Sequence, residues 1–488
     1  MRFGLFLASL TLSVPLLCSA AGEDTKALLC SNGSVCFTEP PADVQSLSRI
    51  FAQGEFVGRL RTNSFFYDYR DDSYAGRKDN RAVAVGGSLI FRSALYRGFG
   101  AKAALYTSQN PYHMDDADVV YLKSGKDVTD RYRVLKNGDW GMSVLAEAFL
   151  RYMKGGTQLR AGRLAFDSLL TAANDSKMIP NTFEGYTLET PVFGDGWLKA
   201  AWLVRQKLRG HTSFHHLLAY GDDPADPYSK YSQNDDSAMH RGLTLSKLNA
   251  LGIKDRLLVA EYRGGVGKRA GVMLNYSTVP DLLSYAAADI YLSFRAAGVK
   301  ISPALRYLRQ MDEGAGAIGG ANLKGDTAGY ADPDSLDGAL YAARVDFARG
   351  DVWRLRVGVS YVEDRGDIVA PWRGFPTGGF TRAMGQYNWY ADTQSYMVRA
   401  DYDFGEAGIA GGLKGTVKYV IEDFDDAKPG VPADIDVVNI DITERFEAVQ
   451  GLYARLRMAI GFGSSQAQPV QKPDPSYSEY RFEVNYLF

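Results

Sequence analysis

Basic side chains recur at alternate positions in several segments of this 488-residue chain. Three of these segments carry an Arg-x-Arg pair, and three others carry a single Arg or Lys at the matching position. The set comprises Arg59, Arg61, Arg354, Arg356, Arg399, Lys418, Arg455, Arg457 and Arg481. A guanidinium group binds a carboxylate through two parallel hydrogen bonds, and a series of weak sites lets an anion pass without being trapped. The pattern therefore predicts a path for carboxylate-bearing solutes, although each arginine alone could simply pair with a neighbouring acid such as Glu147 or Glu483.

A polar segment, residues 166–186, is the second candidate site, and it mixes acidic, amide and lysine side chains. It predicts a constriction whose acidic groups oppose the basic ladder, while composition alone is equally typical of an ordinary polar loop. The aromatic and Gly-rich segment 372–390 is a second candidate constricting element. The residues expected to form this acidic, constricting side are Asp167, Asp175, Lys177, Glu184, Asp401 and Asp403.

Catalytic, cofactor and metal sites are not predicted. His211, His215 and His216 cluster near Ser213, but no coherent acid partner completes a hydrolase arrangement, so buried or exposed histidines of no catalytic role are expected. Acidic runs such as residues 423–426 offer oxygen ligands for a divalent cation. Solvated loops explain these runs better.

The first residues read as a targeting segment, which predicts export. Arg2 is followed by the apolar run 3–17 and by small residues that end at Ala21, so a signal peptide over residues 1–21 is expected. A lipoprotein role for Cys18 is the weaker reading. In an oxidising compartment the two remaining cysteines, Cys30 and Cys36, are expected to form a small disulfide loop rather than a metal site, because no histidine lies near.

Alternation with period two is the strongest structural signal. In residues 480–488 every second side chain is apolar, and the intervening positions carry Arg481, Glu483 and Asn485. The same pattern recurs in residues 353–361, 396–404 and 452–460, and near the start in 56–66. These segments are about ten residues long, the length of a strand that crosses a bilayer obliquely.

Aromatic residues distinguish a membrane barrel from a soluble sandwich. They bracket the apolar faces repeatedly, as Trp353 and Tyr361 do, which is typical of the girdles on a lipid-facing surface. The chain has 30 Tyr and 51 Gly and a net charge of −2, so nothing suggests nucleic-acid binding. We expect an all-β, antiparallel transmembrane barrel of 16–18 strands over residues 55–488, preceded by a short periplasmic segment, residues 22–54. Long polar stretches (112–139, 221–241, 314–335 and 364–392) would be its extracellular loops.

Several segments resemble the OprD-type substrate-specific porins of the outer membrane. DTQSYMVRADYDFGEAGIAGGLKGTVKYV (392–420) is similar to that family's signature around R-x-D-Y-D-F, and NDSKMIPNTFEGYTLE (174–189) is similar to its N-D-x-R-x-x-P-x-T-F-E-G stretch. Weaker likeness lies in residues 55–72, 86–105 and 452–459. Lys177 and the cysteine pair depart from the family's pattern.

The resemblance implies an eighteen-stranded barrel, monomeric or homotrimeric, in the outer membrane of a Gram-negative bacterium. It implies an inward-folded third loop and a basic ladder that passes small anionic or zwitterionic solutes passively, with outer-membrane lipid and lipopolysaccharide as surroundings. The open alternatives are a barrel hydrolase that uses His215 and an adhesin or structural barrel with an occluded lumen. An active transporter is not expected, because the segment before the first strand is too short to build a plug.

Overall fold

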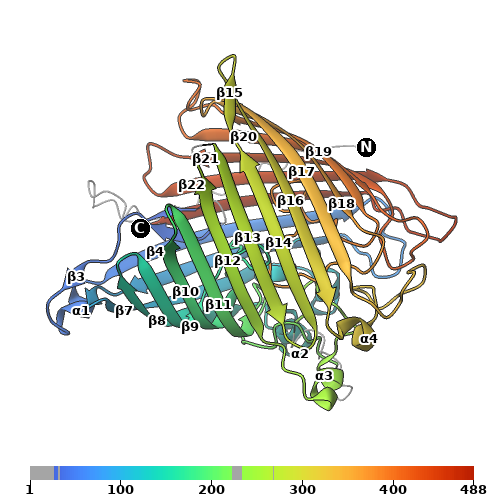
Figure 1. The fold of residues 1–488 in the computed structure, drawn as a ribbon, viewed down its shortest axis with the longest axis horizontal. Helices are drawn as coiled ribbons and strands as arrows, with labels where there is room; N and C mark the ends of the chain where they lie inside the picture. Colours follow the sequence, from blue (N-terminus) through green and yellow to red (C-terminus); the bar gives the residue numbers. More distant parts are fainter. Residues whose placement is uncertain (1–26, 31–32, 223–233, 268) are drawn as a thin grey trace.

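A closed antiparallel barrel forms almost the whole molecule (Figure 1). The computed structural model describes residues 27–30, 33–222, 234–267 and 269–488. Within these ranges eighteen long strands build the wall, in agreement with the predicted class and size. They are β4 (Glu55–Tyr69), β5 (Asn80–Arg92), β7 (Phe99–Tyr112), β8 (Met142–Lys154), β9 (Thr157–Leu164), β10 (Thr182–Val192), β11 (Gly196–Lys207), β12 (Leu257–Val266), β13 (Ala270–Val279), β14 (Leu283–Leu292), β16 (Val299–Asp312), β17 (Gly338–Arg349), β18 (Trp353–Val362), β19 (Gln394–Asp403), β20 (Leu413–Asp423), β21 (Ile435–Arg445), β22 (Leu452–Gly463) and β23 (Tyr477–Leu487).

The first and last long strands close the barrel. β23 pairs with β4, with Asn485 opposite Arg61 and Glu483 opposite Asn63. The chain terminus extends this seam, because the Phe488 amide donates to the Gly58 carbonyl and the Gly58 amide donates back. The seam therefore leaves no free strand edge here, which a barrel in lipid requires.

Alternation along each strand sorts side chains between lipid and lumen, as the sequence predicts. On β23, Tyr480 and Phe482 are exposed on the outer face, whereas Arg481 and Glu483 are buried on the inner face. Each strand has an outer face of exposed aliphatic and aromatic residues, typical of a wall in contact with hydrocarbon. None of the described helices is both long and apolar enough to span a membrane.

The two ends of the barrel differ in the length of their connections. One end has short turns, and the C-terminus lies there together with β3 (Asp43–Val44) and α1 (Arg49–Ala52) (Figure 1). The other end has long loops, which include α2 (Arg131–Asn137), α3 (Leu245–Leu251), α4 (Ala315–Gly319) and the 3₁₀ turns η1 (Asp116–Tyr121) and η2 (Lys126–Val128). Transmembrane barrels place short turns in the periplasm and long loops outside the cell, so we name the ends accordingly.

Short elements complete the wall. β6 (Leu95–Tyr96) and β15 (Phe294–Ala296) extend periplasmic hairpins, and β3 pairs with β6 in parallel. On the outer face Phe51 of α1 stacks on Phe91 of β5 with ring centroids 6.0 Å apart. This places an aromatic anchor at the periplasmic rim, where such rings favour the membrane interface.

The segment that precedes the wall folds into the periplasmic mouth. β1 (Ala27–Leu29) and β2 (Val35–Phe37) form a separate hairpin, and Cys30 and Cys36 are joined in a disulfide. Ala27 and Val35 pack with inward-facing residues of the wall such as Phe65. The hairpin therefore lines the inside of the barrel. The expected signal peptide, residues 1–21, lies outside the described residues.

Candidate functional site: the barrel interior

Loop 165–181, between β9 and β10, folds into the lumen and reaches the wall at β4. Its Asp175 is fully buried and accepts hydrogen bonds from Arg59 (2.9 Å) and Arg61 (2.8 Å) of β4. Arg61 also pairs with Glu483 of β23, and Arg59 donates to the Gly33 carbonyl at 2.8 Å. One carboxylate thus ties the loop to the closing seam and to the hairpin. The resemblance anticipates this inward fold.

Lys177 strengthens the same attachment. Its side chain is buried, its ammonium group donates to the Ser124 carbonyl, and it lies 4.1 Å from the centre of the Phe65 ring. Asn63 of β4 donates to the Lys177 carbonyl at 3.2 Å. Every inward position of β4 from 59 to 65 therefore contacts this loop or its lysine.

Loop 363–393 also folds inward and packs against loop 165–181. The Gly374 amide donates to the Leu170 carbonyl at 3.0 Å, and Thr171 forms a bridge with Arg373. Arg373 is buried and pairs with Asp127 (3.2 Å) and Asp236 (2.7 Å), which belong to two other extracellular loops. Four loops are thus joined by one arginine, and the segment expected as a second constriction contributes to the interior.

These loops leave a cavity of about 1020 Å³ along the barrel wall. It extends from Lys324, in an extracellular loop, to Arg455, three residues from the start of β22 at the periplasmic end. Its acidic lining residues are Asp127, Asp441 and Glu479. Its basic lining residues are Lys123, Lys126, Lys177, Arg209, Arg241, Lys324, Arg356, Arg373, Arg382, Arg399, Lys418, Arg455, Arg457 and Arg481. Basic side chains therefore outnumber acidic ones on the cavity surface, which favours anions there.

Strand register arranges part of this charge as a row. Arg356 of β18 lies opposite Arg399 of β19, and Arg399 lies opposite Lys418 of β20. Arg457 of β22 likewise lies opposite Arg481 of β23. Neighbouring strands are about 4.8 Å apart, so each row brings cations close together on one level of the wall.

Carboxylates neutralise several of the lining cations. Arg399 donates to Asp401 at 2.6 Å, Arg356 donates to Asp346 at 2.9 Å, and Arg455 donates to Asp441 at 2.8 Å. Arg481 pairs with Glu479, and Arg457 lies 3.6 Å from Glu483. These cations still contribute charge, but their hydrogen-bonding groups are partly occupied.

Arg382 and Lys418 differ from those arginines. Neither has a carboxylate within ion-pair distance in the described part of the chain, and the buried Nη1 of Arg382 has no hydrogen-bond partner there. The guanidinium of Arg382 instead lies between aromatic rings, 3.8 Å from the centre of Phe375 and 5.1 Å from that of Tyr387. An arginine held by ring faces keeps its donors available for an incoming anion.

The site residues predicted from the sequence lie on the cavity surface, in a buried cluster behind it, or in pairs away from both. Those on the cavity surface are Arg356, Arg399, Lys418, Arg455, Arg457, Arg481 and Lys177. Arg59, Arg61 and Asp175 instead lie behind that surface in the buried cluster. Arg354 pairs with Asp401 at 2.9 Å, while Asp403 pairs with Lys414 at 2.6 Å. Asp167 accepts from the Ala173 amide at 2.6 Å within its own loop.

The predicted position of Glu184 in the constriction is wrong. It is on the outer face of β10, beside Arg163 (3.0 Å) and Arg205 (3.6 Å), rather than in the constriction. The reason is strand parity: loop 165–181 ends at β10, and from there alternate side chains point to lipid. Glu184 therefore belongs to the exterior of the barrel.

Loop residues supply the cations that sequence reasoning missed. Arg209, Arg241, Arg373, Arg382, Lys123, Lys126 and Lys324 all line the cavity from extracellular loops. Among the segments that carry these seven cations, only segment 372–390 gave a signal of an inward loop, through its aromatic composition. No period-two pattern marks the inward side of an irregular segment.

The histidine cluster lies in the packing of loop 208–256. His211 Nδ1 lies 2.8 Å from His215 Nε2, and His211 Nε2 lies 2.9 Å from Asp235. Burial is the main factor that lowers the pKa of His215 to about 4, so this side chain is neutral at physiological pH. Ser213 is exposed. The histidines thus bond to one another and to loop carboxylates.

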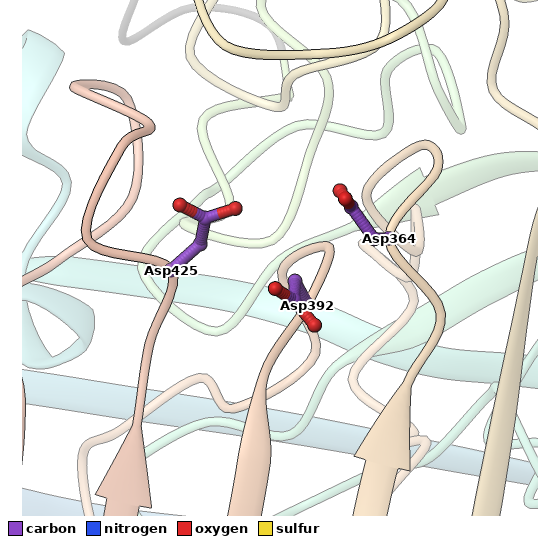
Figure 2. Close-up of side chains that lie close together, drawn as sticks. All are labelled: Asp364, Asp392 and Asp425. Atoms are coloured by element: carbon purple, nitrogen blue, oxygen red, sulfur yellow. The ribbon is translucent and has the colours of Figure 1, made fainter.

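Three carboxylates gather at the extracellular rim (Figure 2). Asp364, Asp392 and Asp425 each offer an oxygen within 4.8 Å of the others. Lys428, whose side chain is buried, pairs with Asp364 at 2.6 Å and also with Asp425. Its ammonium group supplies positive charge to this cluster, which joins loop 363–393 to the next loop.

The closed barrel with an aromatic, lipid-facing exterior and a hollow, charged interior defines a transmembrane β-barrel. Among solved structures, the chain matches Pseudomonas aeruginosa OccK9 (OpdG) with a TM-score of 0.68 and 15% identity, over 90% of this chain and 99% of that one. It matches Acinetobacter baumannii OccAB3 with a TM-score of 0.67 and 14% identity over the same shares. It matches Pseudomonas aeruginosa OpdK, solved with vanillate, with a TM-score of 0.62 and 16% identity, over 89% of this chain and 98% of that one.

These solved structures are OprD-family (Opd/Occ) porins, so the fold expected from the resemblance is confirmed. No protein-family model and no curated protein matches the sequence. The structural likeness thus extends over nearly the whole length of the chain, at a sequence identity that establishes the fold alone.

Proposed function

We propose that this protein is an outer-membrane porin for passive, selective diffusion of small carboxylate-bearing solutes. The fold it shares with OprD-family porins supports a pore for small solutes. The observation that carries the anionic selectivity is the cavity, where fourteen basic side chains face three acidic ones. A carboxylate that loses hydration on entry would be compensated by successive guanidinium groups.

Arg382 and Lys418 are the residues we assign to the first contact with the solute carboxylate, because their donors are free of carboxylate partners. Arg399, which lies opposite Lys418, and the facing pair Arg457 and Arg481 would bind the anion along the same path, since all three line the same cavity. Aromatic lining residues such as Phe380 and Tyr390 offer apolar surface to the carbon skeleton. OpdK, one of the structural relatives, was solved with vanillate, a small aromatic carboxylate, which agrees with this class of solute.

The test is the reversal potential of single channels in a KCl gradient across planar bilayers. The double variant Arg382→Gln/Lys418→Gln should lose much of the anion preference of the parent protein, because two unpaired cations leave the path. Arg349→Gln/Lys300→Gln is the matched control, since it removes the same charge at the periplasmic end of the wall, outside the cavity lining. Equal selectivity in the parent and the cavity variant would refute the assignment.

Solute class is tested by competition. A small aromatic carboxylate should block the ion current at lower concentration than its uncharged amide, and the difference should shrink in the cavity variant. A well-folded barrel that gives no conductance steps would favour the occluded structural barrel. Turnover of lipid or peptide lost in His215→Ala would favour the hydrolase, although the buried hydrogen bonds of His215 give that reading no structural support.

A further inference from the structure

A basic patch lies on the lipid-facing side of the barrel, outside the pore. It consists of Arg163 at the extracellular end of β9, Arg205 near the end of β11 and Arg256 just before β12, and we call it the outer arginine patch. Strand register brings these side chains together: Glu184 of β10 lies opposite both Arg163 and Arg205. Leu258, two residues beyond Arg256, lies opposite Trp202 of β11.

The side chains of the outer arginine patch point outward from the wall. The side chains of Arg163 and Arg205 are 41% and 63% exposed, and Arg256 is exposed as well. Arg256 lies 5.6 Å from the centre of the exposed Trp202 ring, and Arg163 lies 4.7 Å from that of Phe214. The guanidinium groups of Arg256 and Arg163 thus lie near aromatic rings, and the side chain of Arg205 is more exposed than that of Arg163.

The position of the outer arginine patch relative to the membrane follows from the aromatic residues on the outer wall. Tyr186 and Trp202 stack on the outer wall with ring centroids 5.9 Å apart, and both are exposed. Such aromatic pairs lie at the boundary between hydrocarbon and headgroups. Arg205 lies three residues beyond Trp202 on β11. By strand register, Arg163 lies two residues beyond the level of Tyr186 and Arg256 lies two residues beyond the level of Trp202, so all three are about 7–10 Å further toward the extracellular end. That is the level of the headgroups of the outer leaflet.

The charge of the patch is not balanced. Glu184 is the carboxylate that Arg163 and Arg205 share, and its contact with Arg205 is long at 3.6 Å. Arg256 forms no ion pair within the described part of the chain. His216, opposite Arg205 across the bridge between Gln206 and His215, adds a further polar group whose Nδ1 bonds Asp255 at 2.8 Å.

The charge of the extracellular rim is balanced over β16–β18, in contrast to the outer arginine patch. There Arg309 lies between Asp337 and Glu363 at 3.5 Å from each, and Arg365 lies 3.4 Å from Glu363. Two arginines face two carboxylates, so that part of the rim is neutral. Excess positive charge at the outer patch is therefore a local feature and not a property of the whole rim.

We propose that the outer arginine patch binds the phosphate groups of lipid A in the outer leaflet. Guanidinium groups bind phosphate through bidentate, charge-assisted hydrogen bonds. The acyl chains of the same lipid would lie against the apolar wall below, next to Trp202 and Leu258. The proposal requires the barrel to reside in the outer membrane, but it does not depend on what passes through the pore.

The test uses the full-length mature barrel in detergent, with EDTA present so that divalent cations cannot bridge acidic groups. Binding of bis-phosphorylated lipid A and of enzymatically dephosphorylated lipid A is compared by native mass spectrometry. The parent protein should retain the phosphorylated lipid at least tenfold better. The triple variant Arg163→Gln/Arg205→Gln/Arg256→Gln should lose that preference, and Glu184→Gln should increase it.

The control is Arg349→Gln/Lys300→Gln/Arg295→Gln, which removes three cations near the opposite rim and should retain the lipid. Heat-modifiable migration and circular dichroism establish that each variant is folded. The proposal would be overturned if the control and patch variants lost lipid A binding equally. It would also be overturned if the parent protein bound phosphorylated and dephosphorylated lipid A equally well. Anion selectivity of the triple variant should be unchanged, so a failure here is separable from a failure of the pore function.

Discussion

Arg61 of β4 donates from Nη1 to Oδ1 of Asp175 at 2.8 Å, although 114 residues separate them in the sequence. The pair is fully buried, and the same Asp175 carboxylate also binds Arg59. Through this contact the inward-folded loop 165–181 is fixed to the seam where the barrel closes. Position of the constricting loop and closure of the wall are therefore linked.

Asp175→Asn tests that linkage. The substitution keeps the shape of the side chain but leaves Arg59 and Arg61 without their shared charge, and breaking a buried ion pair costs about 3 kcal/mol or more. We expect a lower midpoint of unfolding in guanidinium chloride, because loop 165–181 loses its main attachment to the wall. Single-channel currents should be noisier for the same reason. Asp403→Asn is the control. Its partner Lys414 is largely exposed, so the loss should stay below about 1 kcal/mol.

Gly374→Val should separate the two inward loops. A β-carbon at Gly374 would overlap the backbone of Leu170, where the Gly374 amide donates its hydrogen bond. Because backbone atoms cannot rotate away, we expect loop 363–393 to shift and single-channel conductance to change. Gly271→Ala of β13 is the control, since a β-carbon there meets its neighbours at 3.7 Å or more. Identical conductance in both variants would show that the loop contact does not set the width of the path.

Anion preference should depend on pH near neutrality. Burial lowers the pKa of Lys126, a loop residue on the cavity surface, to about 7. The lysine is therefore charged below that pH and neutral above it, so anion preference should rise as pH falls from about 8 to about 6. Reversal potentials at both ends of this range measure the effect. Lys126→Gln should flatten the dependence, and a profile unchanged by that substitution would assign it to another group.

The disulfide should matter locally. Joining Cys30 to Cys36 closes a loop of about seven residues, which in the chain-entropy description stabilises by about 2 kcal/mol. We expect Cys30→Ser/Cys36→Ser to increase proteolytic cleavage or hydrogen exchange in residues 27–37 while the barrel unfolds at an unchanged midpoint. A large fall in the midpoint would mean that the hairpin supports the wall itself, through contacts such as Arg59 with the Gly33 carbonyl.

Strand alternation let the sequence determine the barrel and its inner face. A side chain on a strand points to lipid or to lumen according to parity alone, so Arg356, Arg399 and Lys418 could be placed inside before any contact was known. Closure at Phe488 and the seam beside Arg481 followed from the same reasoning. These features depend on local pattern and on the requirement that no strand edge faces lipid.

The tertiary structure alone decided which inward cations remain available. Arg59 and Arg61 have the same parity as the ladder residues, yet Asp175 reaches them from a distant loop and buries them. Arg382, by contrast, belongs to an irregular segment, and its place among aromatic rings depends on how loop 363–393 packs. Loops have no fixed periodicity, and their contacts join residues more than a hundred positions apart. The sequence therefore determined the wall and its charge, whereas the packing of the loops decided where that charge meets a solute.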